Sequence, residues 1–294
     1  MLFLVRWLSR RSLRFLHALG ALLGWVAYLA SPSYRRRLDA NARLAGLTDR
    51  QRRAAVAEAG KLLTELPRLW LRPRDVPIND PVRWEGEDLV RELLAQGRGL
   101  VLLTPHMGSF EVSAQAYAEK FGAQQPITVL YRPARQAWLR DLEETARARP
   151  ALATAPANLA GVRNLLRALK KGETLGLLPD QVPPDGLGVW APFFGQSAYT
   201  MTLAARLVAQ TGAAVCVLVT ERLPRGQGYV VRALPLPVPL PEAQPGALPA
   251  EHDLAAATAI NRSMEALILQ APAQYLWGYH RYKQPRSARP GSAV

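Results

Sequence analysis

A histidine and a carboxylate, His106 and Glu111, stand close together in the segment His-Met-Gly-Ser-Phe-Glu, directly after the apolar run from Gly99 to Pro105. On a regular helix, two side chains at this spacing would point about 140° away from each other. They can meet where a strand turns into a helix, which places His106 in the turn after a buried strand at 100–103 and Glu111 near the start of a helix at 108–121. A carboxylate beside an imidazole orients the ring and stabilises its protonated form, as a general base requires. The competing interpretation is a structural pair that caps the helix.

Other catalytic signatures are missing from the sequence. Neither Gly-x-x-x-x-Gly-Lys nor Gly-x-Gly-x-x-Gly follows an expected strand, which argues against nucleotide-driven chemistry. Ser109 does not lie in a Gly-x-Ser-x-Gly elbow, so a serine hydrolase is disfavoured. Four histidines without a His-Glu-x-x-His arrangement and a single cysteine predict no metal site. That cysteine, Cys216, stands in an apolar run and is expected to be a buried core residue rather than a nucleophile.

Strands and helices are expected to alternate along most of the chain. The expected strands are 82–86, 100–103, 126–131, 175–178 and 214–220, and the expected helices are 39–45, 48–66, 87–96, 108–121, 136–147, 158–170, 200–210 and 253–269. This order predicts one main α/β domain whose mostly parallel central sheet is covered by helices on both faces. Pro67 is expected to end the second helix. The proline-rich segment 234–249 cannot be a central strand and is expected to be a surface connection or an edge.

The N-terminus carries an almost wholly apolar stretch, Phe15 to Ala30, interrupted by His17. This stretch is shorter than the roughly 20 residues of an upright membrane span. Arginines flank it on both sides, and with the nearby tryptophans they predict a helix held in the headgroup region of a membrane, with residues 1–37 as the anchor. A cleaved signal peptide is disfavoured, because the arginines after the stretch would hinder translocation. A buried core helix is the remaining alternative, since Gly20 and Gly24 would allow close helix packing.

The chain is strongly basic, with 37 Lys and Arg against 23 Asp and Glu and a net charge of +14. The excess of Arg over Lys suits phosphate-bearing partners, because guanidinium binds phosphate bidentately. An anionic membrane surface, an acidic protein and nucleic acid are all open as partners. Nucleic acid is disfavoured because aromatic residues are not interleaved with the basic runs as a stacking platform requires. With 49% hydrophobic residues the chain can bury a large core. Only the tail at 285–294 is expected to be disordered.

Several segments together resemble the lipid A late acyltransferases, a branch of the glycerolipid-type acyltransferases. The His-four-residues-acid motif from His106 to Glu111 is the first of them. The others follow in family order at 129–133, 169–172, 178–181, 189–195, 211–213 and 274–281. The resemblance covers nearly the whole chain and implies an acyltransferase domain at 38–284.

The resemblance implies a role for each matching residue. His106 would be the general base toward an acceptor hydroxyl, and Glu111 would hold its tautomer and support the imidazolium. Substrate phosphate or the oxyanion would be bound by Arg147 and Arg149, whose alternative is a solvated helix face. Asp180, next to Gln181, would position sugar hydroxyls or a nearby arginine. Arg132 would bind phosphate or lie in a surface turn, and the acyl channel would be lined by Phe193, Phe194 and Gly195.

The implied reaction needs no cofactor, and its co-substrate is an acyl chain carried by acyl carrier protein or coenzyme A. The implied setting is the bacterial inner membrane, with the site facing the cytoplasm. The Ala- and Pro-rich segment 150–160 departs from the lipid A enzymes. Acceptors of a related branch, lysophospholipids and phosphoinositide mannosides, therefore stay open beside lipid A precursors. A non-catalytic membrane-surface protein and a thioesterase remain as alternatives of other kinds.

Overall fold

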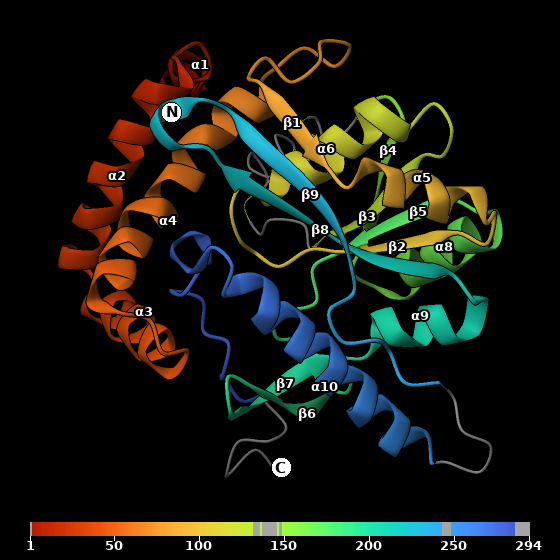
Figure 1. The fold of residues 1–294 in the computed structure, drawn as a ribbon. Helices are drawn as coiled ribbons and strands as arrows, with labels where there is room; N and C mark the ends of the chain where they lie inside the picture. Colours follow the sequence, from red (N-terminus) through yellow and green to blue (C-terminus); the bar gives the residue numbers. More distant parts are fainter. Residues whose placement is uncertain (1, 132–135, 137–145, 147–148, 243–247, 286–294) are drawn as a thin grey trace.

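The protein is an α/β molecule built on a seven-stranded sheet, seen in the computed structural model (Figure 1). The structure describes residues 2–131, 136, 146, 149–242 and 248–285. The strand order is β1-β9-β8-β2-β5-β3-β4, and each neighbouring pair is parallel except β8 with β9. The prediction of a mostly parallel sheet flanked by helices is confirmed.

The strands of the sheet are β1 (Val82–Glu85), β2 (Leu100–Leu103), β3 (Ile127–Tyr131), β4 (Leu152–Pro156), β5 (Thr174–Leu177), β8 (Ala214–Arg222) and β9 (Tyr229–Pro235). A separate antiparallel hairpin pairs β6 (Gly188–Phe193) with β7 (Gln196–Met201). The helices are α1 (Leu2–Ser9), α2 (Leu13–Ala30), α3 (Pro32–Leu44), α4 (Asp49–Trp70), α5 (Glu87–Ala95), α6 (Phe110–Phe121), α8 (Leu159–Lys170), α9 (Leu203–Thr211) and α10 (Pro249–Ile268). Two short 3₁₀ turns, η1 (Pro224–Gly226) and η2 (Pro272–Gln274), also lie within the described residues.

The central strand β2 explains why helices must cover both faces of the sheet. Its side chains alternate between the faces, and all of them are buried. Leu100 and Leu102 pack with residues of α5 and α6, whereas Val101 and Leu103 pack with residues of α8, α9 and α10. A continuous apolar run of this kind is typical of parallel strands buried on both faces.

Four strands, β4, β6, β7 and β9, were not expected from the sequence. β4 lies at the edge of the sheet, where an Ala- and Pro-rich strand is tolerated. The helix expected at 200–210 begins only at Leu203, because 196–201 pair with β6 across a tight turn. β9 reaches into the proline-rich segment as far as Pro235, and β1 pairs only with its first four residues, 229–232. Pro235 therefore has β8 on one side and needs no second partner strand.

Helix α4 begins as expected and ends later than expected. Thr48 caps it in a reciprocal arrangement with Gln51, at the start expected for this helix. The expected end at Pro67 is wrong, because the helix continues through this proline to Trp70. The extra turn buries Leu69 and receives hydrogen bonds from Arg149 onto its last carbonyls. These tertiary contacts therefore offset the cost of a proline inside the helix.

The N-terminal helix α2 packs along α4 (Figure 1). Gly20 and Gly24 of α2 face Gly60 of α4, and a Cβ atom at any of the three would overlap the other helix. This is the close packing that glycines at these positions allow. The expected anchor boundary at residue 37 falls inside α3. The amphipathic stretch expected at 136–147 and the tail at 285–294 lie almost wholly outside the described residues.

Candidate functional site

The turn from Thr104 to Ser109, which joins β2 to α6, is held by hydrogen bonds from three directions. Thr104 N–H donates to the carbonyl of Leu177 at the end of β5 (3.0 Å), and Ser109 N–H donates to Thr220 of β8 (2.9 Å). Leu276 N–H in the C-terminal segment donates to the carbonyl of His106 at 3.1 Å. The turn therefore lies at the carboxyl ends of parallel strands, where open α/β sheets place their sites.

His106 is oriented by Asp180. Its ring Nδ1 lies 2.7 Å from Asp180 Oδ1, and its backbone N–H donates to Asp180 Oδ2 at 2.9 Å. The histidine side chain is 16% exposed, whereas that of Asp180 is 1% exposed. Because the carboxylate can only accept, Nδ1 must carry the proton, and the lone pair of the neutral ring is then on Nε2.

Asp180 is held as an anion in spite of its burial. Burial raises its pKa, but the charge of His106 and the hydrogen bonds from the His106 ring and backbone outweigh burial, so the pKa of Asp180 lies below its ordinary value. Tyr275 is buried next to Asp180, and burial together with that negative charge raises the pKa of Tyr275 well above its usual range. Tyr275 is therefore a neutral hydrogen-bonding neighbour at physiological pH. The sequence analysis assigned it no role.

In the structure the carboxylate of Asp180 contacts His106, and its charge also acts on Arg281. The contacts expected for it with sugar hydroxyls or a nearby arginine stay predictions. Gln181 follows Asp180 and is half-buried. The pairing of His106 with Asp180 has a sequence signal that was not used: both residues follow strands, β2 and β5, that prove to be direct neighbours. The carboxyl ends of parallel neighbours meet at one edge of a sheet.

Glu111 lies in the first turn of α6, as expected. Its Oε2 accepts a hydrogen bond of 3.4 Å from the indole N–H of Trp70. Phe110, one residue earlier, packs its ring against that of His106 with 4.9 Å between centroids. Since Asp180 contacts Nδ1, the ring-orienting role expected for Glu111 remains a prediction, and the variant experiments below separate the two carboxylates.

Arg149 is buried against the end of α4, so the expected alternative of a solvated helix face is wrong. Its guanidinium donates to the carbonyls of Leu69, Arg72 and Pro73 around the end of α4. Burial, and secondarily the nearby positive charge of Arg72, lowers the pKa of Arg149 to about 10. Arg149 therefore closes a helix end, as cations at a helix C-terminus do. Arg132 and Arg147 lie outside the described residues.

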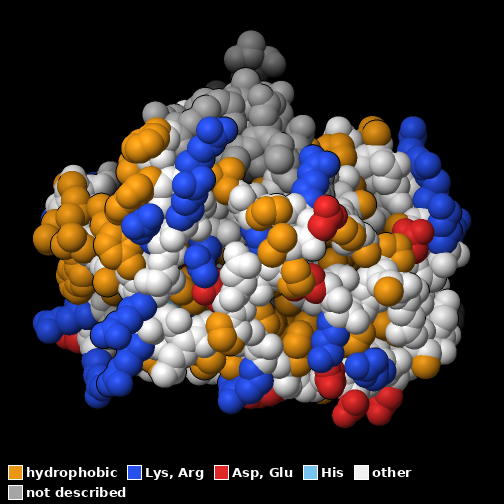
Figure 2. All heavy atoms as spheres, turned by 90° about the horizontal axis from the view of Figure 1, so that it is seen from above, with side chains coloured by type: hydrophobic (Ala, Val, Ile, Leu, Met, Phe, Trp, Pro, Cys, Tyr) orange, Lys and Arg blue, Asp and Glu red, His pale blue; other side chains and the backbone are white. Residues whose placement is uncertain are grey.

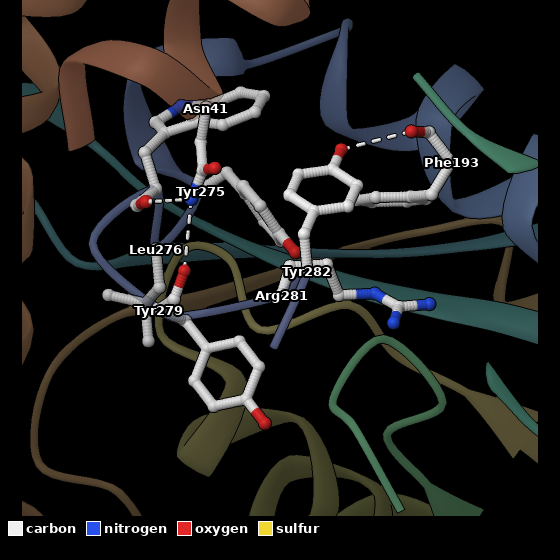
Figure 3. Close-up of a pocket in the computed structure, with 8 residues that line it drawn as sticks. Asn41, Phe193, Tyr275, Leu276, Tyr279, Arg281 and Tyr282 are labelled. Atoms are coloured by element: carbon white, nitrogen blue, oxygen red, sulfur yellow. Dashed lines mark hydrogen bonds between the residues drawn. The ribbon is translucent and has the colours of Figure 1, made fainter. Parts of the chain in front are cut away.

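The residues expected to line an acyl channel form the tip of the β6–β7 hairpin. Phe193 is 1% exposed, and Phe194 and Gly195 form the turn with positive φ angles of 46° and 75°. Phe193 lines a small hollow together with Tyr275, Tyr282 and Arg281, and the Tyr282 hydroxyl donates to the Phe193 carbonyl at 2.9 Å (Figure 3). These aromatic side chains fill the space among themselves. Phe193 is thus a packing residue in this structure.

A second hollow lies next to the turn at 104–109. It is lined mainly by apolar side chains from β2, β3, β8 and α6 and from the end of β5, among them Leu102, Phe110, Val129, Leu178 and Leu218. Phe110 contributes to this hollow and also contacts the His106 ring. An apolar group bound there would lie next to the histidine.

The single cysteine and any metal-ligand cluster would be the other candidates for a site among the described residues. Cys216 is fully buried, and burial raises the pKa of its thiol to about 12, which confirms the expected core residue. Within the described ranges, no group of three or more His, Cys, Asp or Glu side chains is placed to hold a metal ion.

Gly108 cannot be replaced without moving the turn. Its φ is +56°, and an added Cβ would overlap the carbonyl oxygen of Thr220. We expect Gly108→Ala to lower the free energy of unfolding by about 3 kcal/mol and to abolish activity. The matched control is Gly46→Ala, which has a φ of +75° but open space around the added atom. Urea unfolding should show a loss of only about 1 kcal/mol in the control, and equal losses would contradict the steric argument.

Known proteins resemble this chain over most of its length. Residues 1–284 match the family model described as bacterial lipid A biosynthesis acyltransferase. The chain is 30% identical over 205 residues to the lipid A biosynthesis lauroyltransferase of Escherichia coli (strain K12). The matched region covers 68% of this chain and 62% of that relative. The chain is 28% identical over 225 residues to the lipid A biosynthesis palmitoleoyltransferase of the same strain, covering 76% of this chain and 68% of the relative. The chain thus spans less than two thirds of the length of the first of these relatives.

Proposed function

This chain belongs to the bacterial lipid A biosynthesis acyltransferase family, and from that premise we propose that it transfers a fatty acyl chain from a thioester to a hydroxyl group of a lipid A precursor or a related phosphoglycolipid. The observation that carries the proposal is the contact of His106 Nδ1 with the buried Asp180 at 2.7 Å. This contact keeps the proton on Nδ1, so that the lone pair of Nε2 is free to accept the proton of an acceptor hydroxyl. An apolar hollow adjoins the ring.

In the proposed reaction, Nε2 of His106 takes the proton of the acceptor hydroxyl as its oxygen attacks the thioester carbonyl. The C–O bond forms, and the carbonyl electrons move to the oxygen of a tetrahedral intermediate. When the intermediate collapses, the C–S bond breaks and the leaving sulfur receives the proton from the imidazolium. The products are an acyl ester and the free thiol of the carrier. Asp180 stabilises the transient imidazolium through the Nδ1 contact.

The donor is proposed to be acyl carrier protein or coenzyme A, with no further cofactor. The net charge of +14 suits an acidic carrier and also a phosphate-bearing acceptor. Arg147 and Arg132 remain the proposed phosphate or oxyanion ligands, and Gln181 a proposed acceptor contact. The apolar hollow beside Phe110 is proposed to receive the end of the acyl chain near the thioester.

We place the enzyme at the bacterial inner membrane with its site facing the cytoplasm. Within the described residues, one helix, Leu13–Ala30, is long and apolar enough to cross a membrane, a test that core helices and signal sequences also pass. One side of this helix is buried against α4. The other side exposes apolar side chains, namely Phe15, Leu22, Leu23, Val26 and Leu29. Figure 2 shows hydrophobic side chains gathered over the side of the molecule where α1 and α2 lie, with Lys and Arg around them.

Such a helix suits insertion along the headgroup region rather than a span, because its inner face already has protein partners. We expect the double variant Leu22→Ser and Val26→Ser, at positions 61% and 52% exposed, to weaken binding to anionic phospholipid vesicles by about tenfold or more. Leu159→Ser on α8 is the control, since Leu159 is 78% exposed on another surface. Vesicle flotation measures both. Equal binding by both variants and the wild type would exclude this surface as the membrane contact.

The function itself is tested by transfer of a labelled acyl chain from acyl carrier protein or coenzyme A. The acceptor panel contains lipid A precursors, lysophospholipids and glycosylated phosphoinositides. The proposal expects one labelled product on a lipid A precursor with the wild type and at least about a hundredfold less with His106→Gln. Product on a lysophospholipid or a glycosylated phosphoinositide instead would identify that lipid as the acceptor and exclude a lipid A precursor. Absence of product on every acceptor, with folding and membrane binding intact, would leave a membrane-surface protein without this activity.

A further inference from the structure

A buried arginine holds the turn that carries His106. Arg222 ends β8, and its side chain is 2% exposed. Its guanidinium donates to the carbonyl of Gly108 at 2.6 Å and forms ion pairs with Glu58 at 3.0 Å and Glu65 at 3.1 Å. Both carboxylates come from α4. The arginine therefore ties the catalytic turn to this helix.

Glu65 connects the same arginine to the N-terminal helix. Its side chain is fully buried, with one oxygen on Arg222 and the other 3.1 Å from Nε2 of His17. His17 is 5% exposed and lies on the inner face of α2. The Tyr229 hydroxyl also donates to Glu65, at 3.4 Å. A continuous buried path thus runs from α2 through Glu65 and Arg222 to the backbone of the catalytic turn.

An anchor helix alone does not need this path. Burying ionisable side chains is costly unless each is paired, and an apolar contact would dock two helices at lower cost. The helices α2 and α4 lie side by side in Figure 1 and already pack closely at their glycines. The Thr64 hydroxyl of α4 also donates a hydrogen bond of 2.7 Å to the carbonyl of Leu16 in α2. The polar path adds one specific feature, which is a fixed position for the Arg222 guanidinium on Gly108.

We propose that His17, Glu65 and Arg222 are positioning residues that make the docking of helix α2 a condition for a competent active site. The inference rests on the proposed function, since the turn they hold carries the proposed base. Docked α2 places His17 on Glu65, Glu65 fixes Arg222, and Arg222 fixes the Gly108 carbonyl two residues after His106. The helix thereby supports catalysis directly, besides any role in membrane attachment.

The test separates positioning from attachment by measuring acyl transfer to a lipid A precursor dispersed in detergent micelles and, in parallel, in vesicles. His17→Leu places an apolar side chain of similar size at this position and removes the hydrogen bond to Glu65. We expect its kcat to fall by about tenfold or more in micelles and vesicles alike, with KM for the thioester within about twofold, because a misplaced catalytic group lowers the rate. The double variant Leu22→Ser and Val26→Ser changes only the outer face, so its loss should be larger in vesicles than in micelles.

Two further variants distinguish positioning from general stability. Glu65→Gln should repeat the kcat loss of His17→Leu. Asp253→Asn, which removes the Arg206–Asp253 ion pair between α9 and α10, is the matched control because its pair is remote from the turn. If Asp253→Asn loses as much thermal stability as His17→Leu and Glu65→Gln, it should still retain the wild-type kcat. Folded His17→Leu and Glu65→Gln proteins with wild-type kcat in micelles, or kcat losses that merely follow stability in all variants, would overturn the proposal.

Amide hydrogen exchange across residues 104–112 gives a readout that does not depend on turnover. Exchange there should be faster in His17→Leu than in the wild type and unchanged in Asp253→Asn. Unchanged exchange in His17→Leu would contradict the inference even if the wild type acylated none of the acceptors tested. An inactive wild type with the expected exchange pattern would instead contradict the proposed function and leave the positioning path supported.

Discussion

Replacement of His106 by Gln is expected to lower kcat for acyl transfer by about 10²–10⁴-fold, which is the usual contribution of a general base. Glutamine can occupy similar space and still donate toward Asp180, but it cannot take the proton of the acceptor hydroxyl. KM for the thioester should change little, because the histidine acts on the attacking oxygen. Initial rates at saturating donor and acceptor measure the effect.

Thermal unfolding of His106→Gln is the control, and the variant should remain folded near the wild-type temperature. Incubation of the wild type with donor alone then tests whether the base activates water. Little free fatty acid is expected without an acceptor, whereas rapid release would identify a thioesterase. Retention of more than about a tenth of kcat by His106→Gln would contradict the assignment of His106 as the base.

The parts of the fold with clear periodicity could be predicted from sequence. The strand at 100–103 is a short apolar run between turn residues, and the structure has β2 there. The helix after Gly108 was expected because an amphipathic stretch follows the turn, and α6 occupies this stretch. These local signals also placed His106 in the strand-to-helix turn, since the turn depends only on its two neighbouring elements.

The parts that depend on distant contacts could not be predicted in this way. β4 lies in a segment whose alanines and prolines disfavour a strand, and it is stabilised by pairing with β3. β9 runs into the proline-rich segment, and its pairing with β8 extends the strand as far as Pro235. The sequence around Arg149 does not distinguish a solvated or substrate-binding arginine from a buried one. In the structure, Arg149 is buried against the end of α4 and donates to the carbonyl of Leu69. Which carboxylate reaches His106 likewise depends on strand order. Asp180 follows β5, and only the adjacency of β2 and β5 brings it to the imidazole.

Asp180→Asn is expected to lower kcat by about 10²–10⁴-fold, in the range seen when a histidine loses its orienting carboxylate in serine proteases. The carboxylate accepts from both the ring Nδ1 and the backbone N–H of His106, one on each oxygen. An amide offers a single acceptor oxygen, so one of the two donors must lose its partner. The amide also lacks the negative charge that stabilises the imidazolium.

Glu111→Gln is the matched comparison because it removes the other carboxylate near the turn. If Asp180 orients the ring, kcat should fall much further in Asp180→Asn than in Glu111→Gln. The reverse order would return the orienting role to Glu111. Arg149→Met would be a poor control here, because loss of its contacts to the end of α4 lowers stability by itself.

The pH dependence of stability provides an independent check on the charge of Asp180. Its pKa is lowered in the folded protein, so the stabilisation from its ionised form is present above the ordinary value of 3.8 and is lost as the pH falls through the lower folded pKa. The difference in unfolding free energy between the wild type and Asp180→Asn should therefore be largest near neutral pH and should shrink as the solution is acidified below that value. If this difference in unfolding free energy stayed constant to pH values well below 3.8, the charge of the carboxylate would not stabilise the folded site. The loss in the variant would then come from hydrogen-bond geometry and packing.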